Sequence, residues 1–187
     1  MNYRILHIII LVSVFTSCTN ERNEVTVESS TDGLELVNGV LEFNKIPFSG
    51  RLINSFSKDK LKSEIFYTEG EKHGSEKFWF ESGVLAQERF YINGFKSGMH
   101  RAWWSSNQPK FVYHFNNRGA FDGEVKEWYK TGQLYMSFNY KNGKEKGSQR
   151  LWKVDGTIKA NYEVIHGDRF GLIGLKKCSN VSTPKNQ

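Results

Sequence analysis

The sequence predicts an all-β fold, an elongated antiparallel sheet of tandem β-hairpin repeats of about 24 residues. Six glycines recur at intervals of 24 or 25 residues, and we call them the anchor glycines: Gly50, Gly74, Gly98, Gly123, Gly147 and Gly171. Between them apolar and polar residues alternate with a period of two, and no window of a dozen residues keeps a helical period. Only three prolines occur, so the backbone donors that a sheet needs are preserved.

Glycine placement defines the turns of each repeat. A glycine stands four residues before most anchors, and another follows several anchors by nine residues. Fourteen of the seventeen glycines fall in this register: Gly50, Gly70, Gly74, Gly83, Gly94, Gly98, Gly119, Gly123, Gly132, Gly143, Gly147, Gly156, Gly167 and Gly171. Glycine adopts positive φ at little steric cost. We therefore expect positive φ or close backbone contacts at the anchors.

The repeat that follows Gly74 illustrates the expected local structure. Ser75–Phe80 is a first strand, the sequence "ESG" is a turn, Val84–Ile92 is a second strand, and Asn93-Gly94 opens the next turn. In a later second strand the alternate apolar residues are Leu134, Met136, Phe138 and Tyr140. One face of the sheet should thus be apolar and the other largely polar. Because such a sheet has a thin core, aromatic side chains must supply most of its buried area.

The N-terminus predicts export and lipidation. Arg4 precedes an apolar run, Ile5–Phe15, which is too short to cross a bilayer as a helix and is typical of a signal peptide over residues 1–17. The run ends in Phe15-Thr16-Ser17-Cys18, which resembles the lipobox of bacterial lipoproteins. We expect Cys18 to be lipidated and to tether the chain to a membrane of the bacterial cell envelope. The alternative is ordinary secretion, with Cys18 an incidental cysteine.

The mature chain should contain one folded domain. Residues 18–33 are polar and charged, which predicts a flexible tether; residues 34–178 form the repeat domain, and residues 179–187 form a disordered tail. Beyond residue 17 the chain has 25 basic and 20 acidic residues, a net charge of +5. Acylation of Cys18 would leave Cys178 as a structural thiol without an intramolecular partner.

Two rows of residues recur with the anchors. Tryptophans stand five residues after four anchors, and a basic residue precedes each tryptophan by two. The basic residues are Lys77, Arg101, Lys126 and Arg150, and the tryptophans are Trp79, Trp103, Trp128 and Trp152. Residues i and i+2 of a strand share a face. The tryptophans are either core residues with the bases at the rim, or part of an exposed stripe that binds anionic glycans, lipid headgroups or an acidic protein surface.

Loop length distinguishes these two interpretations. A three-residue loop at "ESG" or "KTG" places Trp79 on the apolar face with Leu85, whereas a two-residue loop places Trp79 on the opposite face. The sequences suit three-residue loops, with glycine in the left-handed region. We therefore favour tryptophans in the core.

The repeats resemble those of a known family. The segments "YTEGEKHGSEKFWFESGVL", "YINGFKSGMHRAWW", "GAFDGEVKEWYKTGQL" and "YKNGKEKGSQRLWKVDGTI" are similar to the bacterial variant of the MORN repeat, over roughly residues 41–174. The resemblance implies an elongated array of β-hairpins. It also implies two functions, since some proteins with these repeats are described as YwqK-like antitoxins and eukaryotic MORN proteins are associated with membranes and phosphoinositides.

The residues predict binding rather than catalysis. No histidine pair has the spacing of a metal site, no nucleophile motif occurs, and the glycine turns lack the lysine and serine or threonine of a phosphate loop. We expect neither a cofactor nor a metal, and the charge is too small and too mixed for nucleic-acid binding. We expect a membrane-anchored scaffold that binds a protein or an anionic polymer; the alternative is an antitoxin or immunity protein.

Overall fold

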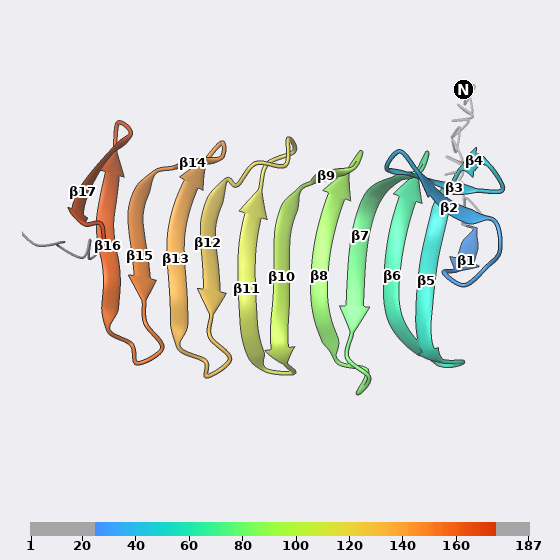
Figure 1. Cartoon of the computed structure of the whole chain (residues 1–187), viewed down its shortest axis with the longest axis horizontal. Helices are drawn as coiled ribbons and strands as arrows, with labels where there is room; N and C mark the ends of the chain where they lie inside the picture. The colour runs from blue at the N-terminus through green and yellow to red at the C-terminus, as the bar shows by residue number, and fades with distance from the viewer. Residues whose placement is uncertain (1–24, 175–187) are drawn as a thin grey trace, which may run out of the picture.

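The computed structural model describes residues 25–174, all of which lie in strands or in the loops between them. Fourteen strands form one long sheet, and Figure 1 shows its long strands side by side in a single layer. Their bounds are β1 (Thr26–Glu28), β5 (Gly50–Ser57), β6 (Lys60–Thr68), β7 (Glu71–Trp79), β8 (Leu85–Ile92), β9 (Phe95–Lys96), β10 (Gly98–Ser105), β11 (Gln108–Phe115), β12 (Gly123–Trp128), β13 (Leu134–Lys141), β14 (Lys144–Glu145), β15 (Gly147–Trp152), β16 (Ile158–Ile165) and β17 (Asp168–Leu172). Apart from β1, neighbours pair antiparallel, which confirms the predicted fold class. In this part of the chain nothing could cross a membrane as a helix.

A second, smaller sheet covers the N-terminal end of the long one. It consists of β2 (Leu34–Val37), β3 (Val40–Phe43) and β4 (Ile46–Pro47). Leu41 and Phe48 are buried together with Val27 of β1, and Leu52 of β5 packs against this cluster. The N-terminal end of the array therefore has its own hydrophobic core.

The folded part begins earlier than the sequence predicts. Within the segment predicted to be a flexible tether, residues 18–33, the structure places β1, which pairs in parallel with β5. Val27 is buried, because it fills the space between the small sheet and the long one. The polar composition of this segment predicted no structure. Burial of one valine is enough to hold so short a strand against the sheet, and composition does not reveal such a contact. Outside the described residues lie the predicted signal peptide (residues 1–17), residues 18–24 of the predicted tether, the predicted tail (residues 179–187), Cys18 and Cys178.

The hairpin loops have the predicted length. In the loop after β7, Phe80 N donates to Val84 O and Gly83 N donates to Phe80 O, both at 2.8 Å. Gly83 has a φ of 85°, and the equivalent Gly132 has a φ of 90°. These are three-residue loops closed by a left-handed glycine, as the sequence predicts.

A β-bulge beside each loop changes which side chains lie on which face of the sheet. Trp128 pairs with Leu134, but its neighbour Glu127 pairs with Met136, so one residue of β13 is extra. Leu134 therefore lies on the face of Trp128, while Met136 lies on the opposite face with Phe138. The same shift occurs at the pairs of Trp79, Trp103 and Trp152. The sequence predicted that Leu134, Met136, Phe138 and Tyr140 share one face. This prediction is wrong for Leu134.

Each repeat folds its turn segment back over one face of the sheet, which we call the inner face. A turn segment runs from the glycine four residues before an anchor to that anchor. Consecutive segments are joined by backbone bonds: Gly70 N donates to Phe48 O, Gly94 N to Lys72 O and Gly143 N to Phe121 O, at 2.8–2.9 Å. Figure 1 shows β9 and β14, which belong to these segments, crossing the ends of the long strands. The segments form a partial second layer along one side of the sheet.

This partial layer creates the core of the array. The side chains two residues before the anchors contact the inner face, and Phe121 stacks on Phe115 with ring centroids 4.7 Å apart. Beneath the layer lie the side chains two residues after the anchors, which are the most deeply buried of the described residues: Glu76, His100, Val125 and Gln149. The sequence did not single out these positions.

All fourteen glycines of the predicted register have positive φ, so the prediction for the anchors is confirmed. Gly70 and Gly83 have similar angles, 79° and 85°, but differ in their surroundings. A Cβ on Gly70 would collide with Val40 Cγ1 and lie 2.8 Å from Leu41 O, whereas a Cβ on Gly83 would meet nothing within 4 Å.

Alanine at these two glycines should separate strain from crowding. We expect Gly83→Ala to lower the free energy of unfolding by about 1–2 kcal/mol, the cost of the left-handed conformation alone. Gly70→Ala should cost at least about 1 kcal/mol more, because the small sheet must also move. Urea unfolding of both variants measures the difference. Equal losses would show that the turn segment does not hold the small sheet in place.

Candidate functional site

The inner face contains a buried carboxylate. The side chain of Glu76 forms ion pairs with Lys72 and Arg89, and Tyr91 Oη donates to it at 3.2 Å. Burial alone would lower the pKa of Lys72, but the hydrogen bond and charge of Glu76 outweigh it and raise that pKa. The Lys72 ammonium also lies 5.2 Å from the ring centre of Tyr91. All of these groups satisfy one another, so the cluster is structural.

His100 and Gln149 occupy equivalent positions and make equivalent bonds. His100 Nε2 donates to Phe90 O at 2.8 Å, and Gln149 Nε2 donates to Asn139 O at the same distance. Each carbonyl also accepts a backbone bond from the turn segment, from Ser97 N and from Lys146 N. Each buried side chain therefore ties the turn segment to the strand beneath it. Burial lowers the pKa of His100, which keeps the imidazole neutral.

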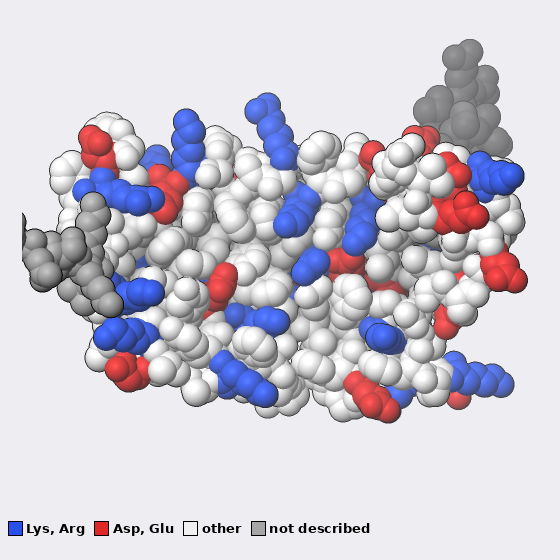
Figure 2. All heavy atoms as spheres, viewed as in Figure 1, with Lys and Arg blue, Asp and Glu red and all other residues white. Residues whose placement is uncertain are grey.

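Away from the turn segments, the inner face is a shallow surface of half-buried aromatic and apolar side chains. Phe111 and Tyr113 stack with ring centres 4.3 Å apart, and Tyr113 Oη donates to Glu127 Oε1 at 2.6 Å. Burial, with the help of Glu127, raises the pKa of Tyr113. Figure 2 shows one broad side of the molecule, on which uncharged surface separates scattered charges. No described residue forms a full second layer over this part of the sheet.

The predicted basic row lies on the other side of the sheet, which we call the outer face. Strand pairing places the following residues in one line across the strands: Glu64, Lys77, Glu88, Arg101, Val112, Lys126, Ser137, Arg150 and Asn161. Bases thus alternate with acids in the N-terminal half of the line and with uncharged residues in the C-terminal half.

Ion pairs neutralise the N-terminal half. Arg101 Nη2 lies 2.6 Å from Glu88 Oε2, and Lys77 Nζ lies 3.9 Å from Glu88 Oε1. Lys126 Nζ pairs with Glu124 Oε2 at 2.8 Å. Within the described residues Arg150 has no ion pair, and its side chain is exposed. Lys126, in the C-terminal half, is thus neutralised as well, and Arg150 is the base of this row that lacks an ion pair within the described residues.

The predicted tryptophan row is neither core nor freely exposed. Trp79, Trp103, Trp128 and Trp152 are all half-buried. The Arg101 guanidinium lies 5.3 Å from the ring centre of Trp103, which shows that this ring shares the outer face with its base. Placing the tryptophans in the core was wrong, because the bulges turn Leu85 and its equivalents to the outer face as well. Of the four base–tryptophan pairs, Arg101 and Trp103 show the expected contact between base and ring.

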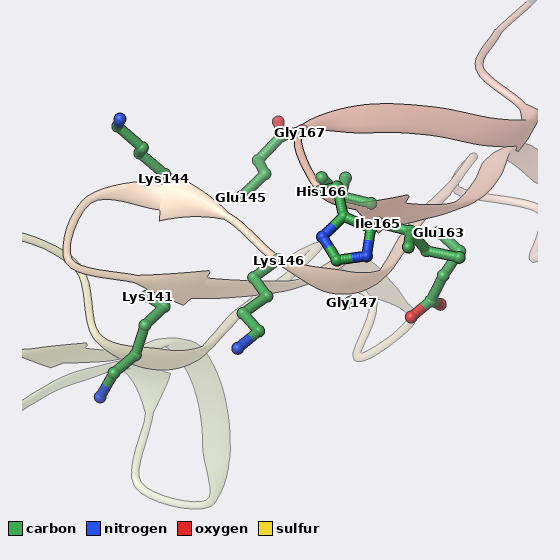
Figure 3. A pocket seen from close by; sticks show the side chains of 10 residues that line it. Lys141, Lys144, Glu145, Lys146, Gly147, Glu163, Ile165, His166 and Gly167 are labelled. Carbon is green, nitrogen blue, oxygen red and sulfur yellow. The ribbon is translucent and has the colours of Figure 1, made fainter.

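Contacts between consecutive turn segments change toward the C-terminus. Glu69 N donates to Ser49 Oγ at 2.8 Å, and Ser97 Oγ donates to Asn117 Oδ1 at 2.8 Å, each pair joining residues twenty apart. The last such pair in the described part of the chain is Lys146 and His166, which no hydrogen bond joins. A cavity of about 620 Å³ opens there, lined also by Lys141 and Glu163. Figure 3 shows Lys141 and Lys146 pointing to one side of the hairpin and Lys144 to the other.

The described residues contain no group of three or more His, Cys, Asp or Glu side chains that could hold a metal ion. The cavity beside Lys146 offers positive charge, and none of its lining residues is a nucleophile paired with a base. Its chemistry suits weak attraction of an anionic group.

Comparison with known proteins identifies the repeats. Residues 72–93 and 121–142 match the MORN repeat variant. Both matches start in a turn segment and end at the next left-handed turn, so each covers one turn segment and the hairpin that follows it. No curated protein matches the chain. These two segments are therefore similar to MORN-variant repeats, which suggests a repeat-type binding module.

The buried imidazole should make stability depend on pH. The pKa of His100 in the folded chain lies below its unfolded value of about 6.5. Protonation therefore favours the unfolded chain, and stability should fall as the pH drops below about 6.5. His100→Gln should lose less stability over this range. At pH 8 the same variant should stay within about 1 kcal/mol of the parent protein, because the amide can donate to Phe90 O as Gln149 does to Asn139 O.

Urea unfolding at pH 8 and pH 5 tests this expectation. His100→Leu is the matched control at pH 8, where removal of the donor should cost about 1–3 kcal/mol. If the parent and the Gln variant lose stability equally on acidification, His100 is not the group responsible.

Proposed function

We propose that this protein is a non-enzymatic lipoprotein of the bacterial cell envelope, which uses its repeat sheet as a scaffold to bind another envelope protein or an anionic polymer. The observation that supports this most is the single-layer sheet itself. Half-buried aromatic side chains such as Phe111 cover much of its inner face, and the described residues supply no second layer above them. Large, lightly covered apolar surfaces are typical of sites that bind other molecules.

The charge of the outer face favours an anionic group on the partner. In the C-terminal half of the row, Lys126 and Arg150 alternate with Ser137 and Asn161. The cavity beside Lys146 adds further basic side chains at the same end of the array. A partner that carries acidic residues, sulfates or phosphates would find its best match there.

Membrane attachment depends on Cys18. We expect Cys18→Ala to abolish metabolic labelling with palmitate and to move the protein from the membrane fraction to the soluble fraction. Cys178→Ala is the control, and it should keep both the label and the location. Absence of label on the parent protein would contradict lipidation at Cys18.

Electrostatic binding should be concentrated at the C-terminal half of the basic row. Binding of dextran sulfate can be measured for two double variants with the same change in net charge. Lys126→Glu with Arg150→Glu should weaken binding by about tenfold at low salt, about 1.4 kcal/mol. Lys77→Glu with Arg101→Glu should weaken it less, because Glu88 pairs with both of these bases, whereas Arg150 has no ion pair within the described residues.

The salt dependence of binding provides a second measure in this experiment. Affinity of the parent protein should fall as salt rises, because exposed charges are screened over about 8 Å at physiological ionic strength. The dependence should be flatter in the C-terminal double variant. Equal effects of the two double variants would rule out a localised stripe.

Identification of the partner decides between the scaffold and the immunity function. Affinity capture of the mature protein from envelope extract, followed by mass spectrometry, should recover a structural envelope protein or a polymer-bearing fraction. Recovery of a single toxin in stoichiometric amount, inhibited by the purified protein, would instead establish the antitoxin or immunity function that the family resemblance suggests.

A further inference from the structure

The two ends of the sheet are finished differently. At the N-terminal end the small sheet and β1 cover the hairpin of β5 and β6. At the other end β17 pairs only with β16 among the described strands, and all five of its residues are exposed. Exposed sheet edges present unpaired backbone groups and can pair with a further strand.

One side chain of β17 departs from the pattern of the earlier repeats. The residue before an anchor is polar in five repeats: Ser49, His73, Ser97, Asp122 and Lys146. In the sixth it is Phe170, which is 56% exposed. Leu172, directly after the last anchor, is 46% exposed. Both lie on the outer face, where they pair with Glu163 and Asn161. Two exposed apolar side chains on one face of an unpaired edge strand indicate a surface that another molecule covers.

The hairpin geometry defines which backbone groups of β17 are available. His166 and Gly167, with φ of 52° and 94°, form a two-residue turn between Ile165 and Asp168. In such a hairpin the residues that flank the turn exchange backbone hydrogen bonds, and every second residue beyond them does the same. Phe170 and Leu172 therefore bond to β16. The backbone groups of Arg169, Gly171 and Ile173 point away from the sheet.

We propose that two copies of this chain pair through β17, antiparallel, about a two-fold axis at Gly171. In this register Gly171 exchanges backbone bonds with Gly171 of the partner subunit, and Arg169 does so with Ile173 of the partner subunit. Phe170 then lies opposite Leu172 of the partner subunit, in the closer kind of pair, in which Cα atoms are about 4.5 Å apart. The two-fold axis repeats the pair of Phe170 and Leu172, so this pair occurs twice in the dimer.

The strand is self-complementary in this arrangement. Two apolar pairs form on the outer face. Asp168 and Arg169 of the two copies lie at opposite ends of the joint, so no like charges face one another. A two-fold contact of this kind closes on itself and produces a dimer rather than a fibre. Pairing through β17 depends neither on the lipid anchor nor on the scaffold function.

The remaining chain is a poorer match for this edge than a second copy. Residues 175–187, "LKKCSNVSTPKNQ", contain three lysines, a proline and only two large aliphatic residues, Leu175 and Val181. A strand from this segment would cover Phe170 and Leu172 with fewer apolar contacts. Proline would also remove one donor from any ladder it joined.

Sedimentation velocity of the full-length chain in density-matched detergent tests the proposal. Because one short edge buries less than a standard interface of about 1,600 Å², we expect a reversible dimer with Kd on the order of micromolar. Phe170→Lys and Leu172→Glu should each weaken it by about tenfold or more. Ile158→Lys is the matched control: this residue is 51% exposed on β16, and the variant should dimerise like the parent protein.

The double variant Phe170→Lys with Leu172→Glu tests the register. Each introduced lysine would face an introduced glutamate across the two-fold axis, so dimerisation should return to within about threefold of the parent protein. Circular dichroism confirms that each variant is folded. A parent protein that stays monomeric at about 200 µM, well above the expected Kd, or that forms species larger than a dimer, would overturn the proposal; failure of the double variant to recover would overturn the register.

Discussion

Burying one face of a single-layer sheet is the problem on which the rest of this structure depends. A sheet normally packs against another sheet or against helices, but this chain builds its cover from the turns of its own hairpins. Turn segments cross the strand ends, and most are joined to a neighbouring segment by a backbone hydrogen bond, such as the one that Gly94 N donates to Lys72 O. To follow this path the backbone needs positive φ at both ends of the turn segment, and glycines occupy most of these positions. The glycine register and the core are therefore two consequences of one geometry.

A core built in this way tolerates polar side chains. Backbone carbonyls of the strands, such as Phe90 O of β8, lie next to the buried row of side chains. A buried acceptor without a partner costs about 1–3 kcal/mol. A histidine or a glutamine that supplies a second donor is therefore as suitable as an aliphatic residue. Glu76 follows a different solution, because Lys72 of its own turn segment neutralises it. No buried side-chain nitrogen or oxygen in residues 25–174 lacks a hydrogen-bond partner.

The sequence predicts the local features of this fold better than the packing between them. Spacing of the anchors, the three-residue loops and the alternation in β16 all follow from residue types close together in the chain. The bulge that separates Leu134 from Met136 has no signal in the sequence, because it depends on the neighbouring strand. Folding of Phe121 onto Phe115 is a tertiary contact and was missed for the same reason. Polar residues at a constant distance after the anchors, Glu76, His100 and Gln149, were a usable signal, since alternation should have placed apolar residues there.

In a repeat array each repeat contacts mainly its two neighbours, so each terminal repeat has one side without a neighbouring repeat to cover it. The N-terminal end of this array is finished by Val27, Leu41 and Phe48. The proposed dimer would finish the other end with a second copy of the same edge. A two-fold axis perpendicular to the sheet keeps both outer faces on the same side, and it brings the two C-terminal halves of the basic row toward the centre. Positive charge from Arg150 of each copy would then lie on one continuous surface, which links the state of assembly to affinity for an anionic partner.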